Sequence, residues 1–252
     1  NVNLNDVEYN DVSGLPVFVK NGITFGADGG YFTLNYNSYT YSTFLFKRAI
    51  SIFDIFAYTG TGANQNIPHN LGVLPELWIV KCRNEPTRSW VVGSSLLSNT
   101  QILSLDSNSG VSTGGSTYWN STFPGQYTVS VGSDNNVNQS TRNFVAYLFA
   151  SKAGISKVGT YVGNGSSQTI NCGFSTGARF IMIKRTDSAG DWFIWNTTSG
   201  IVAGNDPHIS LNTSAAEVTV DDTIDPETSG FIVNQNLNVN VTSATYLYLA
   251  IA

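Results

Sequence analysis

Two stretches of the sequence decide the fold: YTGTGANQNIPHNLGVLPELWIVK at Tyr58–Lys81 and YVGNGSSQTINCGFSTGARFIMIK at Tyr161–Lys184. The second stretch begins 103 residues after the first. Besides Tyr58 and Tyr161, this offset relates Gly60 and Gly163, Gly62 and Gly165, Gln65 and Gln168, Ile67 and Ile170, and Lys81 and Lys184. Self-similarity at a fixed period is the signature of a repeat architecture. The chain therefore contains a duplication.

The matches continue to the end of each copy. After a slip of one residue Trp90 matches Trp192. Three further pairs follow in the same order, ILSLD at Ile102–Asp106 with HISLN at His208–Asn212, QYTVS at Gln126–Ser130 with GFIVN at Gly230–Asn234, and FVAYLFA at Phe144–Ala150 with YLYLAIA at Tyr246–Ala252. We expect two full units, at residues 52–152 and 153–252, docked rigidly because the linker SKAGIS between them is short.

The N-terminal residues resemble the back half of a third copy. Gly22–Phe25 is similar to Gln126–Val129, and Phe44–Ala49 is similar to Tyr147–Lys152. We therefore predict an N-terminal half-repeat at residues 1–51, with apolar strands at Val17–Val19, Ile23–Phe25 and Phe44–Phe46. A half-copy cannot bury its own apolar face, and bare strand edges invite association. Either the first full unit covers these strands, or a neighbouring subunit does in a homo-oligomer.

Each unit reads as β-structure throughout. LWIVK at Leu77–Lys81 and FIMIK at Phe180–Lys184 are short apolar runs of the kind found in buried strands. Turn formers such as Ser188–Asp191 separate the runs, and no segment combines helical periodicity with a cap. The predicted fold class is all-β, with tandem antiparallel β-sandwich-like repeats, two of them complete.

Composition narrows the classes of function. Only 12% of the 252 residues are charged, the net charge is −5, and no basic run occurs. This excludes a coiled coil and argues against binding to nucleic acid, which requires neutralisation of phosphates. No apolar stretch approaches the roughly 18 residues of a membrane span, so no membrane insertion is expected. The first residue is Asn rather than Met, which suggests a processed or excised piece.

The two cysteines, Cys82 and Cys172, do not form a disulfide framework. We expect two free thiols in a protein assembled in a reducing cytosol, while a single Cys82–Cys172 bridge, which would imply secretion, stays open.

Catalytic motifs are sparse. The two histidines, His69 and His208, lie in a turn and at a strand start, where a structural role is favoured over that of a general base. A glycosidase would need two converging carboxylates, and Asp187 and Asp191 flank a turn that Asp commonly caps. We expect no enzymatic activity and no cofactor.

Candidate ligand sites come from aromatic and acidic clusters. Aromatic rings beside amides suit carbohydrates, and two stretches have this composition, with Tyr118, Trp119 and Asn120 in one and Tyr36, Tyr39 and Tyr41 in the other. Core packing for Trp119 and an edge strand for the tyrosines are the competing interpretations. Asp221, Asp222 and Asp225 are a weak candidate for calcium, with a solvated acidic loop as the alternative.

Several phrases of the chain resemble an uncharacterised repeat domain of virion proteins of tailed phages, which is common in marine phages. These phrases are FDIFAYTGTG at Phe53–Gly62, WNST at Trp119–Thr122, FIMIKRTDSAGDWFI at Phe180–Ile194, IVAGNDP at Ile201–Pro207, NTSAAEV at Asn212–Val218 and IDPETSGF at Ile224–Phe231. The resemblance covers residues 40–252, and residues 1–39 match less well. It implies a place, the virion, and supplies no catalytic or ligand residues.

From this resemblance we expect a non-enzymatic virion protein, assembled in the cytoplasm of a bacterial host. The favoured role is a tail fibre or other appendage that attaches to the host and binds a surface glycan or receptor. A head-decoration or tail-scaffold protein is the structural alternative, and a polysaccharide depolymerase is the third. Expected partners are other virion proteins and copies of the chain itself. A trimer is favoured, because phage appendages of this kind are commonly trimeric.

Overall fold

The computed structural model describes residues 17–19, 22–24, 41, 43–114, 116–235 and 237–252. The chain separates into two compact units, of which the larger contains Arg48–Ala252 and the smaller contains Val7–Lys47. In the smaller unit, β1 (Val17–Val19) and β2 (Gly22–Thr24) pair as an antiparallel hairpin. In the larger unit the elements are antiparallel strands and two four-residue helices, α1 (Ser116–Trp119) and α2 (Asn135–Asn138), so the predicted all-β fold is confirmed.

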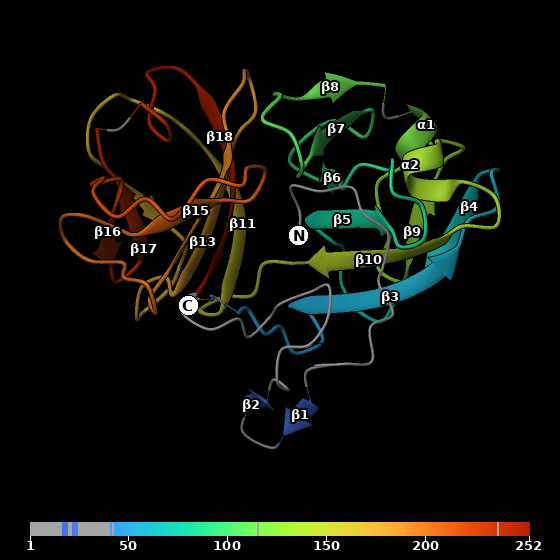
Figure 1. Ribbon diagram of the computed structural model, residues 1–252, viewed down its shortest axis with the longest axis horizontal. Helices are drawn as coiled ribbons and strands as arrows, with labels where there is room; N and C mark the ends of the chain where they lie inside the picture. Colours follow the sequence, from blue (N-terminus) through green and yellow to red (C-terminus); the bar gives the residue numbers. More distant parts are fainter. Residues whose placement is uncertain (1–16, 20–21, 25–40, 42, 115, 236) are drawn as a thin grey trace. The chain divides into compact units, whose positions relative to one another are not determined.

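The first full repeat is a sandwich of two sheets (Figure 1). The larger sheet has the order β3 (Phe53–Thr59), β10 (Asn143–Phe149), β5 (Leu77–Cys82), β6 (Val91–Ser94), β7 (Gln101–Ser104) and β8 (Ser112–Thr113). The smaller sheet pairs β4 (Gln65–Pro68) with β9 (Thr128–Val131). Ile67 and Val129 from the smaller sheet share one apolar core with Val80 and Phe144 from the larger sheet. The core holds the two layers together, because burying these side chains removes apolar area from water.

The second repeat has the same plan (Figure 1). Its larger sheet has the order β11 (Ser156–Val162), β18 (Thr245–Ile251), β13 (Phe180–Arg185), β14 (Trp192–Asn196) and β15 (His208–Ser210). Its smaller sheet has the order β12 (Gln168–Asn171), β17 (Gly230–Val233) and β16 (Ile224–Glu227). Strand for strand, the order of the five-stranded sheet repeats the first five strands of the preceding sheet. This agreement supports the duplication read from the sequence.

One predicted strand is not formed. Phe44–Phe46 has no strand structure, although its sequence resembles that of β10. In each full repeat the equivalent strand is central, since β10 pairs with both β3 and β5. Among the described N-terminal residues, β1 and β2 pair with each other, and no described strand pairs with Phe44–Phe46 in the way that β3 and β5 pair with β10. Sequence similarity to a central strand therefore overestimated the structure of this segment.

Each repeat contains a buried asparagine whose side chain holds two turns together. Asn138 is fully buried, and its amide nitrogen donates to the carbonyls of Ala63 and Gly132, at 2.6 Å each. Its amide oxygen accepts hydrogen bonds from the Thr61 amide and from Gln65 Nε2. All the strong hydrogen-bonding groups of the side chain are thus engaged, as a buried amide requires. The residue ties the turn before β4 to the turn after β9.

Asn240 repeats this network in the second copy. Its amide nitrogen donates to the carbonyls of Ser166 and Asn234, and its oxygen accepts from the Asn164 amide and from Gln168 Nε2. Both glutamines of the network were among the identical residues in the sequence match. Polar groups buried this completely specify one arrangement of the surrounding turns.

Replacing either asparagine should be costly. Asn138→Ala or Asn240→Ala leaves buried main-chain groups without partners, and we expect each to lower the free energy of unfolding by about 3 kcal/mol. Chemical denaturation measures the change. Asn64→Ala, at an exposed position with one side-chain hydrogen bond, is the matched control and should cost less than about 1 kcal/mol. Equal effects at positions 64 and 138 would contradict the assignment.

Candidate functional site

The two repeats of the larger unit meet through hydrogen bonds to main-chain atoms. The loop after β7 lies against the hairpin between β13 and β14, where the Asn108 carbonyl accepts from Lys184 Nζ at 2.9 Å and from the Gly190 amide at 2.8 Å. The Val111 amide donates to the Thr186 carbonyl at 2.8 Å. These hydrogen bonds hold the loop after β7 against the hairpin along its length. Without them, the loop would be held only at its two ends.

Lys184 and Trp192 anchor the contact from the second repeat. Trp192 Nε1 donates to the Ser104 carbonyl at 2.8 Å, and the Lys184 ammonium lies 5.9 Å from the centre of the Trp192 ring. Lys184 is fully buried, and burial lowers the pKa of its ammonium from 10.5 to about 8. Two carbonyl oxygens, those of Asn108 and Gly190, accept from this group and compensate part of its lost hydration.

The lowered pKa predicts a pH dependence. Between pH 8 and 10.5 the unfolded chain binds more protons at Lys184 than the folded chain, so this residue makes the free energy of unfolding rise with pH over that window. Lys184→Met removes the titration, and denaturation at several pH values should show a shallower rise for the variant. Parallel curves for the two proteins would contradict the lowered pKa.

Gly110 permits the close approach of the loop. A Cβ atom at this position would lie 2.9 Å from the carbonyl oxygens of both Thr186 and Ser188. These are main-chain atoms, so they cannot swing away as the end of a flexible side chain could. The glycine is therefore required by the contact between the repeats.

Gly110→Ala should loosen this contact without unfolding either sandwich. We expect a loss of about 1–3 kcal/mol in the free energy of unfolding, as for overpacked sites, and faster proteolysis in the loop. The control is Gly125→Ala, where the nearest atom to a new Cβ would be 3.6 Å away, an ordinary contact. An unchanged stability for Gly110→Ala would show that the loop does not pack as described.

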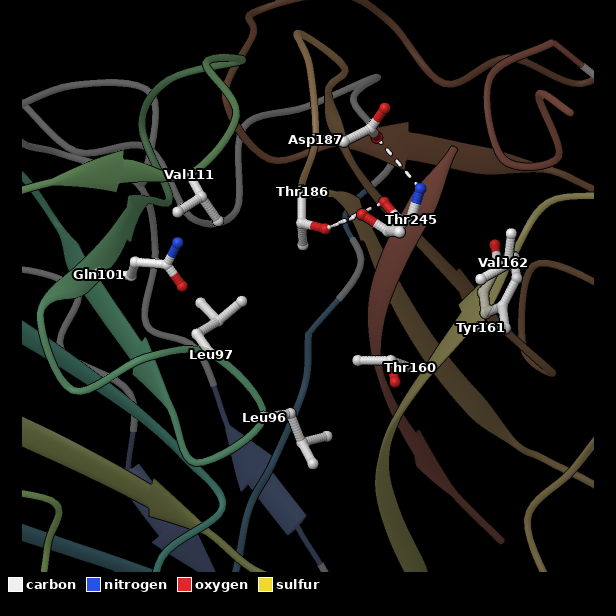
Figure 2. A pocket seen from close by; sticks show the side chains of 10 residues that line it. All are labelled: Leu96, Leu97, Gln101, Val111, Thr160, Tyr161, Val162, Thr186, Asp187 and Thr245. Carbon is white, nitrogen blue, oxygen red and sulfur yellow. Dashed lines mark hydrogen bonds between the residues drawn. The ribbon is translucent and has the colours of Figure 1, made fainter. Parts of the chain in front are cut away.

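A groove of about 750 Å³ lies where the two repeats meet (Figure 2). It is lined by residues from both repeats, namely Leu96, Leu97, Gln101, Val111, Thr160, Tyr161, Val162, Thr186, Asp187 and Thr245. Pockets for small ligands commonly occur at such boundaries and combine an apolar lining with a few polar groups. We take this groove as the candidate binding site.

The apolar part of the lining comes from two elements. Leu96 and Leu97 lie in the loop between β6 and β7, and Figure 2 shows them across the groove from Thr160 on β11. Strand β11 is at the edge of its sheet and pairs only with β18. The side chains of Leu96 and Val162 are 44% and 57% exposed, so apolar surface is available to a ligand.

The polar part is held in place by hydrogen bonds. The hydroxyl groups of Thr186 and Thr245 lie 2.6 Å apart, and Asp187 Oδ1 accepts from the Thr245 amide at 3.1 Å. Arg185 donates two hydrogen bonds to Asp187, which lowers the pKa of that carboxyl group below its usual value. Asp187 is thus an ionised hydrogen-bond acceptor at neutral pH, and it is the one acidic side chain in the described lining. Together with Gln101, this set can bind hydroxyl or amide groups.

The structure places the predicted aromatic site elsewhere. Trp119 is 1% exposed and packs edge-on against Trp78, with ring centres 5.5 Å apart. Its ring face is therefore not available to a sugar, which corrects its assignment as a ligand residue. Tyr118 is partly buried, with Asn136 Nδ2 donating to its hydroxyl group, and the Asn120 side chain accepts from Asn64. None of the three lines the groove.

Of the N-terminal tyrosines, Tyr41 is 44% exposed, whereas Tyr36 and Tyr39 lie outside the described residues. The proposal that they bind a ligand stays a prediction.

Residues of the acidic run make local hydrogen bonds. Asp222 and Asp225 both accept hydrogen bonds from Asn234 Nδ2, and the Asp221 carbonyl accepts from the Asp206 amide. In the described part of the chain, no group of three or more His, Cys, Asp or Glu side chains has an arrangement that could hold a metal ion. The side chains of Asp222 and Asp225 therefore hold Asn234, and the calcium hypothesis for Asp221, Asp222 and Asp225 stays a prediction.

The other chemically active side chains have structural positions. Cys82 and Cys172 are buried free thiols, so the structure has no Cys82–Cys172 bridge. His69 Nδ1 accepts from the Leu71 amide and Nε2 lies 3.1 Å from the Gly125 carbonyl, so the ring bridges two loops. Burial lowers the pKa of His69, and it is neutral at physiological pH.

A family of known sequences matches the part of the chain that contains the two full repeats. The family described as Domain of unknown function (DUF7483) matches residues 42–252. The chain belongs to this family. The DUF7483 match covers both full repeats and the groove between them, and it stops short of β1 and β2. No curated protein and no solved structure matches the chain. In the described residues, no helix has the length and apolar character needed to cross a membrane.

Proposed function

We propose that the chain is a non-enzymatic virion component of a tailed phage, an appendage protein such as a tail fibre, and that the groove between its repeats binds a saccharide of the host surface. The virion location is supported by the sequence phrases that resemble phage repeat domains. The binding role is supported by one observation, a groove whose two walls come from different repeats and whose polar groups are already oriented.

The rigid contact between the repeats suits an appendage. In proteins built from stacked repeats, each repeat contacts only its neighbours. Each boundary between repeats must therefore be stiff if the array is to hold a binding surface in place. Here the boundary uses four hydrogen bonds to main-chain carbonyls, donated by Lys184, Gly190, Val111 and Trp192. Such a boundary also keeps the groove walls at a fixed separation, which lowers the entropy lost on binding.

The polar lining suits a saccharide. Sugar hydroxyl groups both donate and accept, and Gln101, Thr186 and Asp187 together offer both functions. Leu96 and Val162 can cover the C–H face of a sugar ring, although an aromatic ring would do so more strongly. The expected affinity is therefore weak for one site, and many copies on a particle would raise it through multivalency.

The carboxylates considered for catalysis are engaged locally. Asp187 accepts two hydrogen bonds from Arg185, and Asp191 accepts one from Asn212. These partners give each carboxylate a role in a turn, which supports binding rather than bond cleavage.

Blocking the groove should weaken binding. Thr160→Arg places a long cation among the lining residues, and we expect binding of the chain to host cells or to a glycan array to fall about tenfold or more, which corresponds to roughly 1.4 kcal/mol. Thr169→Arg, at an exposed position of β12 away from the groove, is the control and should bind as the parent does.

Three results would contradict this proposal. The first is equal binding by the two arginine variants, which would remove the groove from the site. The second is contact with the capsid lattice alone in cryo-electron microscopy of the particle, which would favour a head-decoration protein. The third is release of oligosaccharide from host envelope, lost on substitution of one carboxylate, which would indicate a depolymerase.

A further inference from the structure

A second pocket lies at the end of the first repeat, beside the linker that leads to the second repeat. Its volume is about 640 Å³, and the side chains that carry its chemistry are those of Val73, Leu74, Glu76, Ser95, Gln126 and Ser151. None of these residues lines the groove between the repeats. We call this cavity the linker pocket, and it is a site separate from the groove.

The carboxylate of Glu76 is held in place in the linker pocket. The Glu76 amide donates to the Phe149 carbonyl at 2.9 Å, and the Glu76 carbonyl accepts from the Ser95 amide at 3.0 Å and from the Ser94 hydroxyl group at 2.7 Å. In the side chain, Oε2 accepts from the Ser151 amide at 2.5 Å. The main chain and one carboxylate oxygen are therefore already fixed for a ligand.

Two acceptor atoms in the linker pocket are not used by the protein. Glu76 Oε1 has no hydrogen-bond partner among the described residues. Gln126 Nε2 donates to the Gly72 carbonyl at 2.8 Å, which leaves Oε1 of the same amide as a free acceptor. The described lining contains no Lys, Arg or His, so Glu76 is its one charged side chain. A positively charged N–H donor is the group that such a carboxylate binds most strongly.

The second repeat shows that the fold does not require a carboxylate at this position. Arg179 is the counterpart of Glu76, because its amide donates to the Ile251 carbonyl and its carbonyl accepts from the Thr197 amide in the same pattern. One repeat thus has a cation where the other has an anion. The hydrogen bond to the Ser151 amide needs an acceptor but no charge. The negative charge of Glu76 is therefore explained by neither the strand ladder nor the linker.

We propose that the linker pocket binds an organic ammonium group, which donates to Glu76 Oε1, with Gln126 Oε1 as a second acceptor for the same ligand. An ammonium group has three donors and no acceptor, which suits two oxygen atoms that lack donors. The Ser95 hydroxyl group can bind a polar substituent of the ligand. Val73 and Leu74 can cover its carbon skeleton, since Leu74 is 61% exposed. An amino sugar and an aliphatic diamine both have this chemistry.

The expected affinity is low and depends on salt. Glu76 is half-buried, so water and dissolved ions screen its attraction for a cation. We expect a dissociation constant of about 1 mM for a small amine. Binding should weaken as salt is added, because the ion pair supplies most of the attraction.

NMR titration of the ¹⁵N-labelled full chain with three small molecules tests the proposal. Glucosamine is an amino sugar and putrescine is an aliphatic diamine, whereas N-acetylglucosamine has a neutral amide in place of the ammonium group. The amines should shift the signals of the Ser151 amide and of the Gln126 side-chain amide, and the tighter of the two identifies the preferred source of the ammonium group. N-acetylglucosamine should bind about tenfold more weakly than glucosamine at these signals.

Variants of Glu76 separate the charge from the structural role. Glu76→Gln keeps an acceptor for the Ser151 amide and removes the charge, so it should weaken amine binding about tenfold. Glu76→Arg copies the second repeat and should abolish amine binding. Glu217→Gln removes the same charge at an exposed position outside the pocket, and this control should bind as the parent does. Circular dichroism of each variant establishes that the fold is retained.

Any one of three outcomes would overturn the proposal. The first is that neither amine shifts the two signals at concentrations up to about ten times the expected dissociation constant. The second is that N-acetylglucosamine binds as tightly as glucosamine. The third is that Glu76→Gln binds amines as the parent does. These outcomes leave the groove between the repeats untouched, because that site is tested separately through Thr160.

Discussion

The arrangement of the larger unit depends on one buried lysine and one buried tryptophan. The N–H donors of both side chains need main-chain acceptors, and the neighbouring repeat supplies them. The hairpin between β13 and β14 supplies one acceptor for Lys184, the Gly190 carbonyl. The preceding repeat supplies the others, the Asn108 carbonyl for Lys184 and the Ser104 carbonyl for the Trp192 indole. Leaving such groups dry and unpaired is costly, so the loop after β7 must stay docked. Its position in turn forces a glycine at residue 110 and sets one wall of the groove.

Inside each repeat, a buried asparagine is a second polar group that fixes the positions of neighbouring segments. Asn138 and Asn240 each hold two turns together with four hydrogen bonds, and the glutamines that assist them lie on the first strand of the smaller sheet. Apolar burial gives the sandwiches most of their stability but little geometric precision. The asparagines and the hairpin anchors supply that precision, which explains why both repeats preserve them while their surface residues differ. A binding groove between the repeats requires both kinds of constraint.

The duplication and the β-structure could be predicted because apolar strands and glycine turns recur in one order along the chain. The prediction of a strand at Phe44–Phe46 was wrong, since a strand needs neighbours that the local sequence does not reveal. Trp119 looked like a sugar platform, and only the packing against Trp78 shows that it belongs to the core. The groove was missed because its lining, including Leu96, Thr160 and Asp187, is brought together by docking between repeats and has no local signature. The one available signal was the matched Lys81 and Lys184 with their tryptophans, whose preservation predicts a shared structural task.

The DUF7483 match spans residues 42–252 and so includes both repeats and the boundary between them. The central claim is that the indole of Trp192 is held by the preceding repeat. Hydrogen exchange of the indole N–H, followed by NMR on protein labelled with ¹⁵N-tryptophan, measures this directly. The account predicts that the Trp192 indole is strongly protected in the parent and loses protection in Gly110→Ala, while the Trp195 indole, which donates to Thr223 inside the second repeat, stays protected in both. A Trp192 indole that exchanges as fast as an exposed one in the parent protein would contradict the account.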